Sequence, residues 1–230
     1  MASIAFDVHF WHLRETEAQD VKDLPGLPIK SLPSLFDFYS YGYCYCGLLS
    51  GPYFQYRVYQ DMLDNPHAGQ IAVLWPALKR LQWVPIFVGV SLYLSQYRSS
   101  YITSPEFYNS PFLDKIIFVA IHFIVFRLRF YIGWALAESA CVIATLGAYP
   151  EQTKPRPGAG PTVELEKGNW KDCQYNFETI YNLDIYKIET GSSLHPAMRY
   201  WNMTVQWWLS SFIYRYWLRK MPNVIRLLKN

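Results

Sequence analysis

Charged residues are scarce in this sequence of 230 residues: they make up 17% of the chain, whereas soluble domains contain about 25%. The 21 basic and 18 acidic residues give a net charge of only +3, and there is no run of lysines and arginines. A nucleic-acid-binding surface needs a stronger basic balance, so we expect no nucleic-acid partner. The 4 cysteines are too few for a small protein held together by disulfides.

Aromatic residues are abundant instead, at 18% of the chain, with 9 Trp, 19 Tyr and 14 Phe. This excludes a disordered protein, because disordered chains have few aromatics. Trp and Tyr favour the headgroup level of a bilayer, so their excess is typical of a membrane protein. A mean hydropathy of −0.02 argues against uniformly apolar helices. Composition leaves two classes open: an aromatic-rich soluble domain, or a polytopic membrane protein whose helices carry polar residues.

Long apolar runs are few. Residues 83–95 are apolar, but 13 residues fall short of the about 20 that cross a bilayer. The longest apolar region, 116–149, contains Arg127 and Arg129, so two short elements or one long tilted helix would fit it. Ser34 is placed to cap the first predicted helix. Helices are predicted near 34–63, with a break at Gly51 and Pro52. Further helices are predicted near 70–97, 112–148 and 198–218, with no β-sheet.

Proline, glycine and mixed charge mark the clearest loop, residues 151–170. We expect this loop to lie in water and to be the least ordered internal stretch, and the polar region to continue to residue 195 with short helices. Residues 1–11 lack the basic n-region of a secretory signal. They have the pattern of the end of a helix, and we expect the numbering to begin inside a longer protein.

No metal site is predicted. Cys44 and Cys46 do not have the C-x₂-C spacing and no His or Cys pair follows them, so buried cysteines are the simpler interpretation. His122 and His195 have no Ser, Cys or carboxylate at a catalytic spacing, and structural roles are expected for both. The sequon Asn202–Thr204 lies in an apolar helix candidate, so we expect it to carry no glycan.

Arg127, Arg129 and Glu138 stand out because they interrupt the longest apolar region. At the bilayer centre each arginine would cost about 2.5–3.5 kcal/mol on the insertion scale. We therefore expect all three side chains to face the protein interior or the headgroup level, with Glu138 a plausible partner of Arg129. A water-facing turn between two helices is the alternative, and the residues alone leave it open.

One block carries a specific signal: residues 198–209 read M-R-Y-W-N-M-T-V-Q-W-W-L. It resembles the signature of the membrane-bound O-acyltransferase (MBOAT) family, and within it the lysophosphatidylinositol acyltransferase branch. Further similar stretches follow in the family's order: 33–35, 39–41, 43–45, 51–54, 56–57, 126–131, 137–138, 147–150 and 175–180. The resemblance covers nearly all of this chain but only the middle of a family member.

The resemblance implies an all-α, polytopic membrane helical bundle that is incomplete here, with residues 1–230 as the central part of a single MBOAT domain and 151–195 as a polar loop region. Family members are multi-pass proteins of the endoplasmic reticulum and related membranes. They transfer a fatty acyl group from acyl-CoA, a co-substrate rather than a bound cofactor, to a hydroxyl. This branch acylates lysophosphatidylinositol with polyunsaturated chains, so the implied partners are both substrates and the lipid bilayer.

By the same resemblance, Asn202 occupies the position of the family's active-site asparagine. The family's catalytic histidine lies on a following helix, whereas no residue after Asn202 is a histidine here. We therefore expect the 230-residue chain to be inactive, with His195 in the preceding loop and a poor substitute. The residues expected to bind substrate are Trp201, Trp207, Trp208, Arg127, Arg129, Tyr56 and Arg57, although packing is expected for at least one tryptophan.

A second class of function remains open from the sequence: a non-catalytic membrane scaffold, or a lipid-binding or transport protein. A transporter would more often contain paired broken helices or an inverted repeat, and the sequence contains no internal repeat. A transcript that continues into an apolar helix with a Trp-His pair would favour the enzyme.

Overall fold

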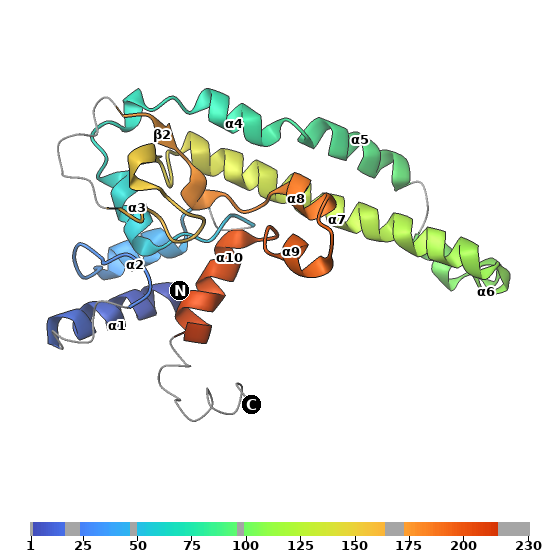
Figure 1. The fold of residues 1–230 in the computed structure, drawn as a ribbon, viewed down its shortest axis with the longest axis horizontal. Coiled ribbons are helices and arrows are strands. Elements are labelled where there is room, and N and C mark those ends of the chain that lie inside the picture. The colour runs from blue at the N-terminus through green and yellow to red at the C-terminus, as the bar shows by residue number, and fades with distance from the viewer. Residues whose placement is uncertain (1, 17–23, 47–49, 96–98, 164–172, 216–230) are drawn as a thin grey trace.

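The computed structural model describes residues 2–16, 24–46, 50–95, 99–163 and 173–215. It is mostly helical, as predicted (Figure 1). The longer helices are α1 (Ala2–Thr16), α2 (Leu35–Gly42), α3 (Tyr56–Leu63), α4 (Leu74–Leu81), α5 (Val84–Leu94) and α7 (Phe112–Ile143). The shorter ones are α6 (Pro105–Asn109), α8 (Ile185–Glu189), α9 (Leu194–Met198) and α10 (Met203–Trp208), which continues as a π-helical segment, Leu209–Arg215.

The predicted absence of β-sheet is wrong at one point. Strands β1 (Tyr149–Pro150) and β2 (Tyr175–Asn176) pair antiparallel, with Tyr149 opposite Asn176 and Pro150 opposite Tyr175. Each strand has only two residues, too few to leave an alternating pattern in the sequence. The pair ties the segment that leaves α7 to the segment that leads into α8.

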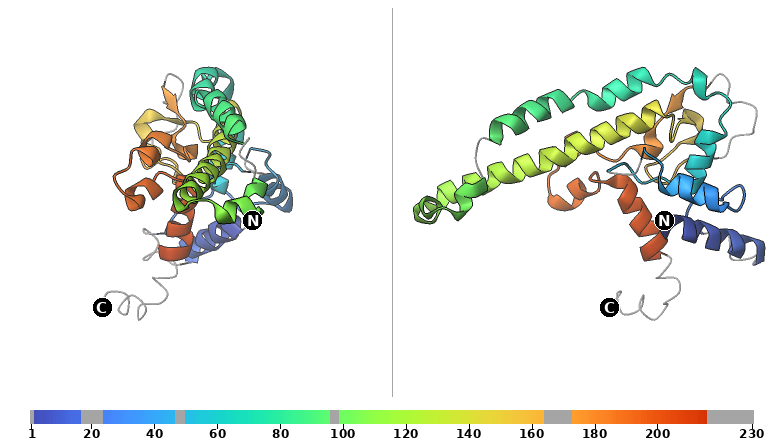
Figure 2. Two further views of the ribbon diagram at one scale, coloured as in Figure 1. Left: turned by 90° about the vertical axis from the view of Figure 1, so that its right-hand side faces the viewer. Right: turned by 180° about the vertical axis from the view of Figure 1, so that it is seen from behind.

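The longest apolar region forms one helix rather than two. At 32 residues, α7 is about 48 Å long, well beyond the about 30 Å of a bilayer's hydrocarbon core. Within the described ranges it alone is long and apolar enough to cross a membrane. Helices α4 and α5 lie along it (Figures 1 and 2). The predicted helix over 70–97 is divided between them, because Pro85, in the first turn of α5, has no N–H to bond back into α4.

Helices α5 and α7 leave large apolar side chains uncovered. These include Ile86, Leu92, Tyr93, Leu113, Ile117, Phe123 and Phe126. Figure 1 shows this part of the molecule extending away from the rest of the chain as a long, narrow pair of elements. Exposed apolar area on this scale indicates contact with a membrane or another protein, which agrees with the sequence-based expectation of a membrane protein.

The predicted helical block 34–63 contains two helices, and the described residues between them, 43–46 and 50–55, are not helical. Ser34 caps α2 as predicted: its Oγ accepts from the Asp37 N–H at 3.2 Å, and the Asp37 carboxylate accepts from the Ser34 N–H at 3.0 Å. The predicted break at Gly51 and Pro52 is confirmed, because both residues lie outside the helices. Helix α3 begins only at Tyr56.

Residues 151–163 are solvated only in part, whereas the sequence predicted a loop in water; the remainder of that loop, 164–170, lies outside the described residues. Thr153, Pro155, Gly158 and Gly160 are buried. Gln55, which is 0% exposed, donates from its Nε2 to the carbonyls of Gly158 and Ala159, both at 2.9 Å, and its Oε1 accepts from Leu27 N at 2.7 Å. The prolines and glycines here shape a packed segment.

Replacing Gln55 by Ala is expected to lower the free energy of unfolding by about 3 kcal/mol, since three buried hydrogen bonds are lost at about 1 kcal/mol each. The measurement is thermal unfolding of the protein purified in detergent. Gln152→Ala is the matched control, because Gln152 lies in the same segment but is exposed. Equal unfolding temperatures for the two variants would show that Gln55 does not hold these segments together.

Candidate active site

Asn202 lies at the N-terminus of α10 in an unusual conformation. Its backbone is left-handed, with φ 52° and ψ 51°, a region that asparagine tolerates better than most residues. The side chain is half-buried, and it makes no capping hydrogen bond to α10. An asparagine at a helix N-cap usually bonds the first turn with its side chain, so the Asn202 carboxamide is left without that task.

The segment around Asn202 is held by residues 182–184. Asp184 N donates to Tyr200 O at 3.1 Å, Leu183 and Trp201 form an isolated β-bridge, and Met203 N donates to Asn182 O at 2.9 Å. These contacts follow one another along the two segments, so they form a short antiparallel pairing. The backbone on both sides of Asn202 is therefore fixed to the same element.

That element is in turn fixed to the long helices by Glu138, which is 2% exposed. Its Oε1 accepts from Asn182 N at 3.0 Å, and its Oε2 lies 3.4 Å from Arg80 Nε on α4. The prediction that Arg129 is the partner of Glu138 is wrong, because the ion pair is made by Arg80. Arg80 also covers the ring of Tyr181, with its guanidinium carbon 4.1 Å from the ring centroid. Glu138 thus faces the protein interior, as predicted.

The three predicted tryptophans fall into two groups. Trp201 packs against the aromatic face of α7, with its ring centroid 5.0 Å from that of Trp134 and 5.7 Å from that of Tyr131. Trp207 and Trp208, which follow Asn202 in the chain, each have a ring centroid 6.2 Å from that of Tyr53. The tryptophans that flank Asn202 in the sequence therefore belong to two different aromatic clusters.

The two arginines of α7 have different surroundings. Arg127 lies 3.2 Å from the Glu189 carboxylate of α8, whose other oxygen accepts from the Tyr131 hydroxyl at 2.6 Å. Arg129 is exposed, and no hydrogen bond or ion pair of its side chain is found among the described residues. The prediction that it faces the protein interior is wrong, because positions two residues apart on a helix differ by about 200°, so Arg129 points away from the side that Arg127 occupies; a position at the headgroup level stays a prediction.

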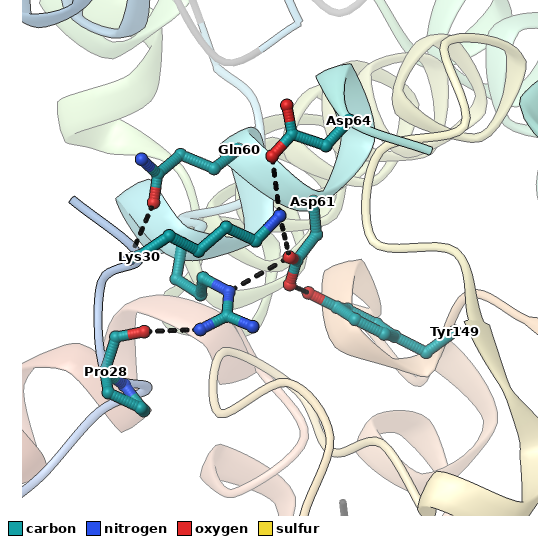
Figure 3. Close-up of polar contacts among 7 residues, drawn as sticks. Pro28, Lys30, Gln60, Asp61, Asp64 and Tyr149 are labelled. Atoms are coloured by element: carbon teal, nitrogen blue, oxygen red, sulfur yellow. Dashed lines mark hydrogen bonds and ion pairs between the residues drawn. The ribbon is translucent and has the colours of Figure 1, made fainter. Parts of the chain in front are cut away.

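Tyr56 and Arg57 lie in a different part of the molecule. Tyr56 is buried against the rings of Tyr41 and Tyr59. Arg57 Nε donates to Asp61 at 2.9 Å, and its NH1 group donates to Pro28 O at 2.6 Å (Figure 3). Their assignment to substrate binding stays a prediction, and these contacts favour a structural role.

Asp61 is the centre of the cluster shown in Figure 3. Besides Arg57, it binds Lys30 Nζ at 2.9 Å and accepts from the Tyr149 hydroxyl at 2.8 Å. Burial and the adjacent Asp61 carboxylate raise the pKa of Tyr149 well above its ordinary value. Burial acts to lower the pKa of Lys30, but the hydrogen bonds to Asp64 and Asp61 outweigh it and raise that pKa. Both groups therefore keep their protons at neutral pH.

Cysteines and histidines show no catalytic arrangement in the described ranges, where no three His, Cys, Asp or Glu side chains are grouped to hold a metal ion. Cys46 is buried, and its carbonyl accepts from the Cys141 thiol at 3.4 Å. His122 Nδ1 lies 3.1 Å from Phe118 O. His195 is exposed in α9, so its predicted loop position is wrong: this residue is helical although it precedes Pro196.

Sequence reasoning missed Asn182 and Thr204, which hold the first turn of α10 next to Asn202. Both are 0% exposed. Thr204 N and Oγ1 donate to Asn182 Oδ1 at 3.2 and 2.7 Å, and Thr204 Oγ1 accepts from Tyr53 N at 2.9 Å. Thr204 was visible as the third residue of the sequon, but no sequence signal pairs it with Asn182.

Comparison with known proteins supports the family resemblance. Residues 24–224 match the family model of MBOAT, the membrane-bound O-acyltransferase family. The chain belongs to this family.

Several relatives have the same activity in their names. The Xenopus laevis membrane-bound acylglycerophosphatidylinositol O-acyltransferase mboat7 is 41% identical over 194 residues, which is 81% of this chain and 41% of that protein. The Homo sapiens protein of the same name, MBOAT7, is 37% identical over 224 residues, covering 94% of this chain and 47% of that protein. The Drosophila melanogaster relative, frj, is 31% identical over 179 residues, covering 76% and 37%. The chain spans less than half the length of these relatives.

If Arg57 is structural, Arg57→Gln should lower the free energy of unfolding by about 1 kcal/mol, because a partly exposed ion pair and one hydrogen bond are lost. The apparent KM for acyl donor and acceptor, measured in the longest natural form of the protein, should not change. Arg156→Gln serves as the control, since Arg156 is exposed. A raised KM with unchanged stability would instead place Arg57 in the substrate site.

Proposed function

We propose that the protein is an acyl-CoA-dependent O-acyltransferase that acylates lysophosphatidylinositol in an endomembrane such as the endoplasmic reticulum, as a multi-pass protein. The observation that carries the proposal is the state of Asn202: a carboxamide without a capping role, on a fixed backbone, in a segment whose flanking tryptophans belong to aromatic clusters. Family membership and the names of the relatives supply the reaction class and the acceptor. The preference for polyunsaturated acyl chains rests on the resemblance alone.

In the proposed reaction the acceptor hydroxyl attacks the thioester carbonyl of acyl-CoA. The new C–O bond forms, the carbonyl oxygen becomes an oxyanion, and the C–S bond then breaks to release the CoA thiol. The Asn202 amide N–H is suited to donate a hydrogen bond to the oxyanion. A carboxamide does not titrate, so the hydroxyl proton must pass to a separate base, and imidazole suits that task near neutral pH.

The aromatic clusters that contain Trp201 and Trp208, which flank Asn202 in the sequence, support a site for an apolar acyl chain. Such a site brings the chain and the hydroxyl together and keeps water from the thioester. Trp207 packs against the Gly158 backbone, where an added Cβ would lie 3.0 Å from the Trp207 Cβ. We therefore assign Trp207 mainly to packing. Trp201 and Trp208 remain the proposed lining residues.

Asn202→Gly is the sharpest test of the assignment. Glycine suits a positive φ, so this variant removes the carboxamide without straining the backbone. Asn202→Ala would also remove the carboxamide, but it would strain the backbone at this φ. In the longest natural form of the protein, acyl transfer from labelled acyl-CoA to lysophosphatidylinositol should fall by about 10²–10³-fold, as for loss of one oxyanion donor, with unchanged protein in the membrane. Asn202→Asp loses the N–H donor and should be equally impaired.

Two outcomes would defeat the assignment of Asn202. The first is a wild-type turnover in Asn202→Gly, and the second is a glycan attached to Asn202. An unmutated protein that binds lysophosphatidylinositol without acylating it would favour the non-catalytic lipid-binding alternative.

Arg129 is proposed to bind an anionic phosphate of lysophosphatidylinositol or of CoA, because an exposed guanidinium at the membrane edge is available for charge-assisted hydrogen bonds. Arg129→Gln should raise the apparent KM for one of the two substrates, with kcat and expression unchanged. Arg127→Gln is the matched comparison: the ion pair with Glu189 favours a structural role for Arg127 over the substrate-binding role predicted from the sequence, so its thermal stability should fall and its KM should stay unchanged. Identical kinetics in Arg129→Gln and wild type would remove Arg129 from the substrate site.

A further inference from the structure

Asn202 is the N-cap residue of α10, yet another residue satisfies the N–H groups of the first turn. Met203 N donates to the backbone carbonyl of Asn182 at 2.9 Å, and Thr204 N donates to its side-chain Oδ1 at 3.2 Å. The first N–H groups of a helix need such partners because no earlier carbonyl is available inside the helix. Asn182 therefore does what the side chain of an N-cap residue ordinarily does.

We propose that Asn182 is a positioning residue for the acyl transfer: it caps α10 in place of Asn202 and so leaves the Asn202 carboxamide free to face the reacting carbonyl. This inference rests on the proposed function of Asn202. It assigns a role to an asparagine that lies outside the 198–209 block but accepts hydrogen bonds from Met203 and Thr204 within it.

The burial and contacts of Asn182 fit a fixed support. The residue is 0% exposed, and its own N–H donates to Glu138 at 3.0 Å, so its backbone is tied to α7. Its Oδ1 accepts two hydrogen bonds, from Thr204 N and from Thr204 Oγ1 at 2.7 Å. An oxygen held by two donors keeps a single orientation, and the first turn of α10 is oriented with it.

The conformation of Asn202 is consistent with this division of tasks. A typical N-cap residue has an extended backbone that turns its side chain towards the N–H groups of the first turn. Asn202 has the left-handed backbone instead, which a residue other than glycine adopts at a cost. The pairing of residues 182–184 with 200–203 supplies contacts that hold this conformation.

Three variants in the longest natural form of the protein test the inference. In Asn182→Ala the acceptor oxygen is lost, and kcat should fall by about 10- to 100-fold, because a shift of about 1 Å in a reacting group costs that much, while KM for both substrates stays unchanged. Asn182→Asp retains an oxygen acceptor of the same shape. It should keep a kcat well above that of Asn182→Ala, since no partner of Asn182 Nδ2 is found among the described residues.

The double variant separates positioning from general stability. If Asn182 acts through Asn202, adding Asn182→Ala to Asn202→Gly should lower kcat no further, because coupled residues are non-additive. Asn176→Ala is the matched control: the Asn176 Oδ1 also accepts a backbone N–H, from Glu178 at 3.3 Å, but on a turn without contact to Asn202. It should leave kcat unchanged.

Failure of this inference and failure of the proposed function of Asn202 give different results. Wild-type kcat in Asn182→Ala together with an impaired Asn202→Gly overturns this inference alone, as does a fully multiplicative loss in the double variant. Wild-type kcat in Asn202→Gly overturns the proposed function of Asn202. Where Asn182→Ala does not reach the membrane, Asn182→Asp decides: wild-type protein levels with kcat as low as in Asn202→Gly would overturn the positioning role.

Discussion

The buried carboxylate of Glu138 is the contact on which the rest of the site depends. A carboxylate that is 2% exposed is stable only if it is paired and hydrogen-bonded. Here the partners are Arg80 on α4 and the backbone N–H of Asn182. Removing one partner of such a pair typically costs about 3–5 kcal/mol, because the remaining charge stays buried. The carboxylate thus obliges three segments, distant in sequence, to meet at one point.

The length of α7 explains why one helix serves two environments. From Lys115, Arg129 is about 21 Å along the helix axis and Glu138 about 35 Å. With Lys115 at one face of an about 30 Å hydrocarbon core, Arg129 lies within reach of the opposite headgroups, since long basic side chains extend towards the interface. Glu138 then lies beyond the hydrocarbon. The apolar part of the helix is thus long enough for a hydrocarbon core, and its last turns reach the polar network that supports Asn202.

The parts of the fold that the sequence predicted are those set by local pattern. The N-cap at Ser34, the break at Gly51 and the helical character of 112–143 follow from neighbouring residues. The errors lie where distant contacts decide. The sequence predicted that Gly158 lies in a solvated loop. Gly158 is buried instead, because a residue without a Cβ leaves room for Trp207. Arg80 was not predicted as the partner of Glu138, since nothing in the sequence indicates that α4 packs along α7.

In the candidate site, too, some features follow from the local sequence and others from distant contacts. Asn202 was identified from its sequence block, and the periodicity of the chain alone would have placed it inside an apolar helix. Its left-handed backbone and the pairing with residues 182–184 arise only in the folded chain.

This arrangement has a chemical consequence. A carboxamide that caps its own helix has its acceptor oxygen committed and its orientation set by that helix. When another asparagine supplies the cap, the Asn202 carboxamide is not committed to the helix and is available to the reacting groups. The fixed backbone of Asn202 limits the positions that this carboxamide can take, and so limits the rearrangement that an oxyanion donor needs as charge develops.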